Sequence, residues 1–364
     1  MRRPRVKPEH ATFRTADGRI RLGGSVHGIA AEVADTTGAI WTMLRAADGS
    51  RTPEEISDVV LAAHPDEQAI AVRAALDQFA DAGYLDDAAA PPPPELTERD
   101  VERHGSARMF YRWIDLRPGG DGWGPQLRLK RARVVVVGVG GTGGSAALAL
   151  AGSGVGRLHL VDGDTVELSN LNRQLVFREA DIGRPKAEAA VGQLRERNRD
   201  IEITGETTRI GGVGDLRRLA RVHDVLVLCA DQPPEIRSWA NRACLDAGTP
   251  WVDAGYHGPV PKATAYRPGL GACYECRQSS LRATLREIVP AAAETLERGA
   301  FNAVIAPTAG LSGHLAAHLA LGIITGVPAI ESGQRQAVGL LTDADDGTTH
   351  CARDPHCFAC GEPS

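Results

Sequence analysis

Residues Arg133–Gln174 read RVVVVGVGGTGGSAALALAGSGVGRLHLVDGDTVELSNLNRQ. The stretch begins with an apolar strand, turns through a glycine-rich loop, enters a helix of small residues and returns as a second strand that ends at Asp162. This order predicts half of a nucleotide-binding βαβ unit. An arginine, several amides and several carboxylates follow closely. An arginine there suits an enzyme that attacks an ATP phosphate, because negative charge builds up on the phosphate oxygens during transfer.

Two motifs in this stretch lie close together. The glycines are Gly138, Gly140, Gly141 and Gly143, and the pattern D-x-D-T-V-x-x-S-N-L-x-R-Q follows from Asp162. Together they resemble the ubiquitin-activating superfamily, in its ThiF/MoeB/HesA branch. The resemblance implies an enzyme that adenylates a carboxylate with ATP.

Composition limits the classes of function. The chain has 41 basic and 46 acidic residues and a formal net charge of −5, which gives no support for binding to nucleic acid. Charged residues follow Met1–Arg5, so no secretory signal is predicted. The apolar segment at 315–324 is too short to span a bilayer. We therefore expect a cytoplasmic protein that binds neither nucleic acid nor membrane.

Seven cysteines include two Cys-x-x-Cys pairs, Cys273 with Cys276 and Cys357 with Cys360. In a chain without a secretion signal, this spacing predicts one four-thiolate zinc site rather than disulfides. Four thiolates complete the tetrahedron and leave no position for water, so the site would be structural. It would tie the C-terminal tail back to the body of the protein. The alternative is two independent redox pairs.

Residues 88–94 read AAAPPPP. A proline run lacks backbone donors and tends to stay extended, so it predicts a linker over 88–95. The linker would separate a small domain, residues 1–87, from a larger one, residues 96–364.

The small domain has its own pattern of elements. It predicts a strand or hairpin over 12–22 and an amphipathic helix over 36–44 with a threonine cap. The run from Thr52 opens a second helix, with a threonine cap, a proline at the first helical position and a glutamate that completes a capping box. A third helix is predicted over 70–82, before a closing strand from Tyr84. This order predicts a winged-helix-like domain.

The small domain also resembles the PqqD-like domains that bind leader peptides of ribosomally made natural products. The residues that carry this resemblance are Thr36–Trp41, Gly49, Thr52, Glu55, Ile56, Leu76, Phe79 and Gly83–Leu85. The alternative is DNA, which winged helices bind more often. The helix over 70–82 carries one arginine and two aspartates, which makes a poor surface for phosphates. A leader peptide would instead add a strand to a sheet edge and pack apolar side chains on this helix.

The larger domain alternates apolar strands with helices. Predicted strands are Val134–Val137, Leu158–Val161, Ile201–Thr204, Asp224–Leu228 and Trp251–Val252, with antiparallel edge strands near Lys262–Tyr266 and Ala337–Thr342. Predicted helices are Gly144–Gly152, Lys186–Arg197, Asp215–Arg221, Glu235–Asp246 and a small-residue helix over Pro307–Ile324, in the core or a dimer interface. This alternation predicts an α/β fold, a doubly wound and mostly parallel sheet covered on both faces.

The nucleotide site is predicted around the glycine loop, whose backbone would approach the phosphates. Asp162 ends the second strand, where a doubly wound fold places the acid that binds the ribose hydroxyls. Asp164 and Asn170 are predicted nucleotide contacts, although Asp164 is equally suited to forming a turn. By resemblance, Arg173 contacts phosphate and Gln174 is its adjacent amide.

Two further residues complete the predicted site. Lys186, at a helix start, matches the phosphate-contacting lysine of the family. Asp231 follows a strand at its carboxyl end, where a carboxylate can hold Mg²⁺ between the phosphates of ATP. The family usually has Asp-Asn at that point, and here Gln232–Pro234 follow the aspartate. In this variation the chain is most similar to the peptide-adenylating enzymes of microcin-C-type biosynthesis.

The segment Met109–Trp113 resembles the family's R-Y-x-R-Q motif, in which the second arginine reaches the site of a neighbouring subunit. The resemblance implies this arginine-finger role for Arg112, and it implies a homodimer. Met109 and Trp113 replace the usual arginine and glutamine.

The sequence thus predicts a homodimeric adenylyltransferase that uses ATP and Mg²⁺, carries zinc and acts on a ribosomal precursor peptide held by residues 1–87. Two alternatives are open. The adenylate could lead to cyclisation of the peptide, or the chain could only deliver a leader peptide to an azoline-forming cyclodehydratase. The presence of Asp162, Arg173, Lys186 and Asp231 favours an active enzyme. A sulfur-carrier activator is less favoured, because it would not need the first domain.

Overall fold

The computed structural model describes residues 1–24, 26, 28–288, 303–342 and 346–361. The chain divides into two compact units, Met1–Leu127 and Arg128–Ser364. The division falls within helix α6 (Trp123–Arg131). The predicted domain boundary at residues 88–95 therefore stays a prediction, and each unit is described by itself.

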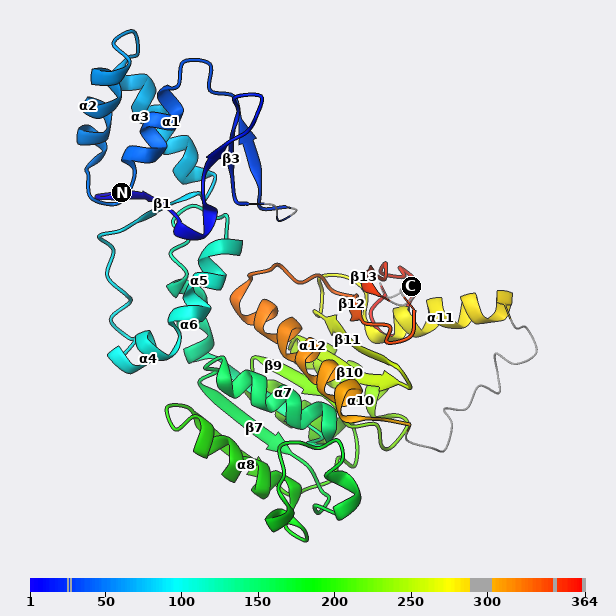
Figure 1. The fold of residues 1–364 in the computed structure, drawn as a ribbon. Helices are drawn as coiled ribbons and strands as arrows, with labels where there is room; N and C mark the ends of the chain where they lie inside the picture. The colour runs from blue at the N-terminus through cyan, green and yellow to red at the C-terminus, as the bar shows by residue number, and fades with distance from the viewer. Residues whose placement is uncertain (25, 27, 289–302, 343–345, 362–364) are drawn as a thin grey trace. The chain divides into compact units, whose positions relative to one another are not determined.

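The first unit contains two small antiparallel sheets (Figure 1). β1 (Pro4–Val6) pairs with β5 (Leu85–Asp87), so the closing strand returns to the start of the chain. The other sheet has the order β2 (Phe13–Arg14), β3 (Ile20–Leu22) and β4 (Ala31–Val33), and it contains the predicted hairpin.

Three helices build the core of the first unit. They are α1 (Ala39–Ala46), α2 (Pro53–Ala63) and α3 (Ala69–Asp81), and their buried residues pack with β3 and β5. The short helix η1 (Pro8–His10) follows β1, and α4 (Glu98–Arg103) and α5 (Gly105–Ile114) come later in the unit.

The helix starts show one correct and one wrong prediction. The capping box of α2 is confirmed: Thr52 Oγ1 accepts from Glu55 N at 3.2 Å, and Glu55 Oε2 accepts from Thr52 N at 2.7 Å. The threonine cap predicted for the helix at 36–44 is wrong, because Gly38 is the N-cap residue of α1 and Thr37 Oγ1 accepts from Ala39 N alone, at 3.4 Å. Asp35 accepts from two first-turn amides instead, and its negative charge suits a helix N-terminus better than a hydroxyl does.

The second unit is built on an eight-stranded sheet with the order β13-β12-β11-β10-β9-β6-β7-β8. Five strands are parallel, namely β6 (Arg133–Val137), β7 (Arg157–Val161), β8 (Glu202–Glu206), β9 (Val225–Leu228) and β10 (Trp251–His257). The antiparallel edge consists of β11 (Val260–Tyr266), β12 (Gln334–Ala337) and β13 (Gly347–His350). The predicted mostly parallel sheet with an antiparallel edge is confirmed.

Helices cover both faces of this sheet (Figure 1). On one face lie α7 (Gly141–Gly152), α8 (Lys186–Arg197) and α12 (Ala306–Thr325), and on the other lie α9 (Val213–Val222) and α10 (Ile236–Ala247). The remaining helices are α11 (Tyr274–Ile288) and the short η2 (Leu168–Asn170) and η3 (Glu179–Asp181). The core under α9 and α10 is formed by residues that include Val135, Leu226, Leu228 and Trp251.

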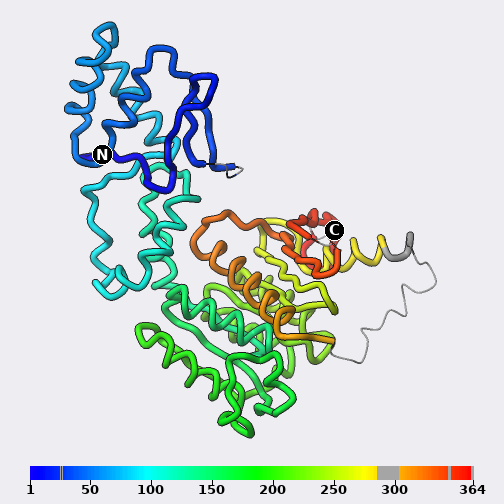
Figure 2. The backbone as a smooth tube through the Cα atoms, in the orientation of Figure 1, coloured from blue at the N-terminus to red at the C-terminus, as the bar shows by residue number. Residues whose placement is uncertain are grey.

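The long helix α12 is part of this core. It packs against α7, β10 and β11, and Figure 2 shows its backbone beside that of α7. Among the described residues it is the one helix long and apolar enough to cross a membrane, with 20 residues and a mean hydropathy of 1.2. Because 56% of it is buried inside the fold, its apolar character is explained by packing.

The last predicted strand is displaced. It was expected over 337–342, and β12 instead ends at Ala337. Beyond it, the amides of Val338 and Leu340 donate to the carbonyl oxygens of Pro261 and Pro259, and the amide between them, Gly339 N, donates to Asp346 Oδ1 and not to β11. Proline has no N–H to return these bonds, so the regular ladder stops there.

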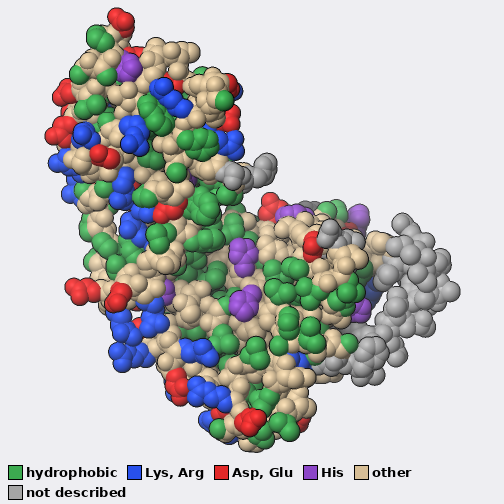
Figure 3. Space-filling view, in the orientation of Figure 1, with side chains coloured by type: hydrophobic (Ala, Val, Ile, Leu, Met, Phe, Trp, Pro, Cys, Tyr) green, Lys and Arg blue, Asp and Glu red, His purple; other side chains and the backbone are tan. Residues whose placement is uncertain are grey.

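Charges are mixed on the surface of both units. On the face drawn in Figure 3, acidic and basic side chains of the described residues are interspersed. This pattern agrees with the near-balanced composition of the chain.

Candidate functional site

The order of the parallel strands reverses between β6 and β9, where open α/β sheets bind their ligands. The loop after β6 begins at Gly138, which has a φ of 87° and lies against the backbone of Ala230 after β9. A Cβ on Gly143 would lie 1.7 Å from the carbonyl oxygen of Gly138. Helix α7 then starts at Gly141 behind Gly140, without a side-chain cap. Such a loop leaves the first-turn amides to a ligand, which suits a phosphate.

Replacing Gly143 by alanine is expected to destabilise the second unit by about 1–3 kcal/mol and to abolish ATP binding, because the new methyl group would push on the loop backbone. Thermal unfolding and binding of a fluorescent ATP analogue measure both effects. Gly152→Ala is the matched control, because it lies on the same helix with nothing within 4 Å of the new Cβ. If Gly143→Ala behaves like this control, the close packing of the loop is not needed for ATP.

Asp162 stands at the end of β7 beside the loop and is half-buried. Its Oδ2 accepts from Val139 N at 2.6 Å, and its Oδ1 accepts from Asp164 N at 2.9 Å. The carboxylate thus fixes the glycine loop to the β7 turn. Its contact with a ribose stays a prediction.

Asp164 and Lys186 are brought together by the fold. Lys186 Nζ lies 3.4 Å from Asp164 Oδ2, and Lys186 N donates to the Asp164 carbonyl oxygen at 2.8 Å. Asp164 also pairs with Arg209, at 2.7 Å from Oδ1. We did not predict Arg209, although it lies beyond the carboxyl end of β8, in the row of strand ends that gave the other candidates.

The segment after β7 places Asn170, Arg173 and Gln174 close together. Asn170 is buried and its Oδ1 accepts from Glu167 N at 3.2 Å, so it shapes the turn. Arg173 Nη1 donates to Ser169 O and to Asn172 Oδ1, each at 2.9 Å. Gln174 is 5% exposed, and its Oε1 has no hydrogen-bond partner within the described part of the chain.

Gln174 and the glycine loop fit ATP. A Cβ on Gly140 would lie 3.7 Å from Gln174 Nε2, so the buried amide lies beside the loop. A buried polar atom without a partner is costly unless a ligand or water satisfies it. The loop amides and this side chain therefore offer polar groups to a nucleotide.

Asp231 is an exposed carboxylate three residues after Leu228, the last residue of β9. It has no ion pair among the side chains that the structure describes, so its oxygens are available. Mg²⁺ is commonly bound through one or two carboxylates together with substrate phosphates. The position of Asp231 at the strand reversal fits this use.

Arg112 is placed differently from what the arginine-finger prediction requires. Its side chain is 7% exposed on α5, with Nε 2.9 Å from Glu9 Oε2 and Nη1 3.1 Å from Asp86 Oδ2. Both acids belong to the first unit, so the guanidinium forms its ion pairs within its own unit. A role in a neighbouring subunit would first have to break these bonds, and it stays a prediction.

Replacing Arg112 by leucine is expected to destabilise the first unit by about 3 kcal/mol, because Glu9 would lose its ion pair in a largely buried position, whereas Asp86 would keep its ion pair with Arg5. Urea denaturation measures the change. The control is Arg73→Leu, since the ion pair of Arg73 with Glu54 is exposed and its loss should change stability much less than the loss of Arg112. Equal stability of the two variants would contradict the structural role of Arg112.

The four predicted zinc ligands meet. The Sγ–Sγ distances are 3.8 Å for Cys273–Cys276, 3.7 Å for Cys273–Cys357 and 3.4 Å for Cys276–Cys360, and all four Sγ atoms lie within 4.8 Å of one another. A tetrahedron with Zn–S bonds of about 2.3 Å has S–S edges of about 3.8 Å, so the cluster fits zinc. A fifth thiol, Cys351, packs against the cluster without belonging to it.

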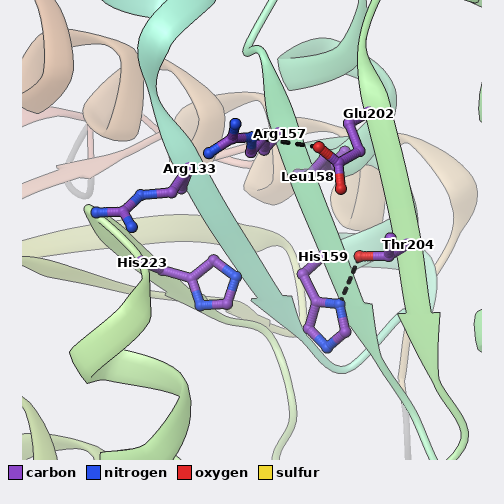
Figure 4. A pocket seen from close by; sticks show the side chains of 7 residues that line it. All are labelled: Arg133, Arg157, Leu158, His159, Glu202, Thr204 and His223. Atoms are coloured by element: carbon purple, nitrogen blue, oxygen red, sulfur yellow. Dashed lines mark hydrogen bonds and ion pairs between the residues drawn. The ribbon is translucent and has the colours of Figure 1, made fainter.

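A small pocket lies at the opposite end of the parallel strands (Figure 4). Arg133 and Arg157, which begin β6 and β7, line it together with Glu202 of β8. The rings of His159 and His223 stack there at 5.6 Å, and burial lowers the pKa of His223. The pocket is therefore separate from the glycine loop, which follows the carboxyl end of β6.

Comparison with known proteins gives a family match over most of the second unit. The family model described as ThiF family matches residues 112–357. The adenylyltransferase and sulfurtransferase MOCS3 of Bos taurus is 37% identical over 276 residues, 75% of this chain and 56% of that protein. The chain spans about half the length of the first curated relatives that it matches. The molybdopterin-synthase adenylyltransferase of Escherichia coli is 32% identical over 271 residues, 74% of this chain and 99% of that protein.

The solved structures match over a longer range. E. coli MccB with ATP has a TM-score of 0.74 and 23% identity, over 98% of this chain and 99% of that one. MccB is also described as a Microcin C7 biosynthetic enzyme in a complex with N-formylated MccA, which aligns with a TM-score of 0.73 and 22% identity. At this identity the likeness concerns the fold, and it includes nearly all of the first unit.

Proposed function

The chain belongs to the ThiF family, and we propose that it is an ATP- and Mg²⁺-dependent adenylyltransferase acting on a ribosomally made precursor peptide. Residues 1–87 bind the peptide, and the second unit activates one of its carboxylates. The observation that carries this proposal is the whole-chain likeness to MccB, which includes the segment before the family match. The second unit also contains the residues expected of an adenylating site, namely the carboxylate Asp231 and the cations Arg173 and Lys186.

In the reaction, an oxygen of the peptide carboxylate attacks the α-phosphorus of ATP. The bond from that phosphorus to the bridging oxygen of pyrophosphate breaks, and pyrophosphate leaves with its electron pair. The amides of the glycine loop surround the phosphates, and Arg173 and Lys186 neutralise the developing charge. Asp231 holds Mg²⁺, which supplies charge stabilisation to the phosphates. Asp162 binds the ribose.

The named relatives favour a second candidate, activation of a sulfur-carrier protein. Molybdopterin-synthase adenylyltransferase and sulfur carrier protein ThiS adenylyltransferase are both matched at above 30% identity. Their matches cover 74% and 48% of this chain, so at least a quarter of it lies outside each. A peptide substrate gives residues 1–87 a function, whereas activation of a sulfur carrier does not require them.

An exchange assay separates the two candidates. The protein is incubated with ATP, Mg²⁺ and labelled pyrophosphate, and either with synthetic peptides encoded by short open reading frames beside its gene or with purified ThiS. We expect label to enter ATP with a peptide and not with ThiS. Exchange with ThiS alone would overturn the peptide substrate and leave the adenylation chemistry intact.

The homodimer, the zinc content and the cytoplasmic location belong to the same proposal. The cysteine cluster supports zinc by its geometry. Sedimentation of the purified protein measures the oligomeric state, and a monomer active at all concentrations would exclude a required contribution from a second subunit.

A further inference from the structure

Arg237 lies near the start of α10 and is not among the predicted site residues. Its side chain is 9% exposed, and its Nε donates to Asp253 Oδ1 at 2.7 Å. The negative charge of Asp253 raises the pKa of this guanidinium, which therefore stays charged. Its Nη1 is buried and has no hydrogen-bond partner within the described residues.

The surroundings of Arg237 place it at the reaction site. Asp253 pairs with Leu228 across the β9–β10 ladder, so the guanidinium lies at the carboxyl end of β9. Asp231 follows the same strand end, three residues after Leu228, and its charge also contributes to the raised pKa of Arg237. A Cβ on Gly255 would lie 3.8 Å from Nη2, so β10 leaves room beside the guanidinium.

Cys229 connects the surroundings of Arg237 to the phosphate loop. It follows Leu228, which pairs with Asp253, the residue that accepts the hydrogen bond from Arg237. A Cβ on Gly143 would lie 3.2 Å from the Cβ of Cys229. Arg237 thus stands on the β10 side of the loop that is proposed to hold the phosphates.

A buried guanidinium with a free N–H group favours an anion, and arginine suits carboxylates best. Asp253 neutralises the charge but occupies Nε, so Nη1 is left to a ligand. In the proposed reaction one anion, the peptide carboxylate, must approach another, the triphosphate of ATP. A cation beside the approach path lowers this repulsion and fixes the attacking oxygen.

We infer that Arg237 Nη1 donates a hydrogen bond to the peptide carboxylate that becomes adenylated. This inference rests on the proposed function. It assigns Arg237 to substrate binding, whereas Arg173 and Lys186 face the nucleotide. A carboxamide at the reacting position is then a poor ligand, because it carries no charge to pair with the guanidinium.

The test uses Arg237→Met and Arg237→Lys, with Arg242→Met as the control on the same helix, where the arginine is 69% exposed. Pyrophosphate exchange at varied peptide and varied ATP gives both specificity constants, and a fluorescent ATP analogue gives the ATP affinity. For Arg237→Met we expect kcat/KM for the peptide to fall about 10- to 100-fold, with ATP affinity within about twofold of wild type. Arg237→Lys keeps the charge and should recover part of the loss.

Four outcomes are informative. A peptide kcat/KM in Arg237→Met equal to that of Arg242→Met would overturn the inference, as would an equal loss of ATP affinity and peptide affinity. If Arg237→Met does not fold, Arg237→Lys decides: a folded lysine variant with unchanged KM for the peptide also overturns it. If none of the peptides supports pyrophosphate exchange by the wild-type protein, the proposed function itself is contradicted, and the inference that rests on it is contradicted too.

Discussion

Asp231→Asn is expected to lower the rate of pyrophosphate exchange by at least about 100-fold, because a metal ion supplies several kcal/mol of charge stabilisation to the reacting phosphates. Asparagine keeps the shape of the side chain and removes the charge that would hold Mg²⁺. Asp231 is exposed and has no ion pair within the described residues, so folding stability should change by less than about 0.5 kcal/mol. A titration with Mg²⁺ should show a higher metal requirement in the variant.

The matched control for Asp231→Asn is Glu235→Gln. Glu235 is also exposed and stands four residues later, at the start of α10. It should keep full activity, because it lies outside the predicted metal site. Wild-type exchange by Asp231→Asn would contradict the assignment of Mg²⁺ to this carboxylate.

Cys357→Ser is expected to remove zinc from the protein and to lower its thermal stability sharply. Structural zinc sites bind with apparent free energies of about 10–16 kcal/mol near neutral pH, and part of this stabilises the fold. The cluster joins the start of α11 to the C-terminal tail, so its loss should release the tail. Elemental analysis of the purified protein and its thermal unfolding give the two measurements.

Cys351→Ser controls for the loss of a thiol. Cys351 packs against the four ligands but lies outside the set, so this variant should keep one zinc per chain and its thermal stability. Zinc retained in Cys357→Ser would contradict the four-thiolate site. Protein that contains no zinc and two disulfides would favour the alternative of redox pairs.

The fold of the second unit could be predicted because parallel strands such as β6 and β9 are short apolar runs, each followed by a helix. Val134–Val137 are all buried in β6, and Gly138 follows at the turn. The edge was harder to predict. The end of β12 depends on Pro259 and Pro261, which lie in and just before the neighbouring strand β11. The sequence of one strand does not reveal which strand it pairs with.

The candidate site could be predicted as far as strand ends and motifs reach. Both identify Asp162, Lys186 and Asp231, which follow parallel strands or open a helix. They do not identify Arg237, which lies inside a helix of mixed composition. Its importance appears only when Asp253 is found against it and Nη1 is found without a partner.

Arg112 shows the opposite limit. A sequence motif predicts a function for this arginine, but its ion-pair partners depend on tertiary packing and cannot be predicted from the motif. Glu9 and Asp86 are 103 and 26 residues away in the chain, and no local pattern connects them to α5.

The central claim is that this protein adenylates a peptide, and mass spectrometry of the peptide tests it most directly. A candidate precursor peptide is incubated with ATP, Mg²⁺ and either wild-type protein or Asp231→Asn. We predict that wild type adds AMP to the peptide, or releases AMP with a peptide that has lost water, and that Asp231→Asn does neither. Peptide of unchanged mass under conditions in which the same protein adenylates a sulfur carrier would contradict the claim.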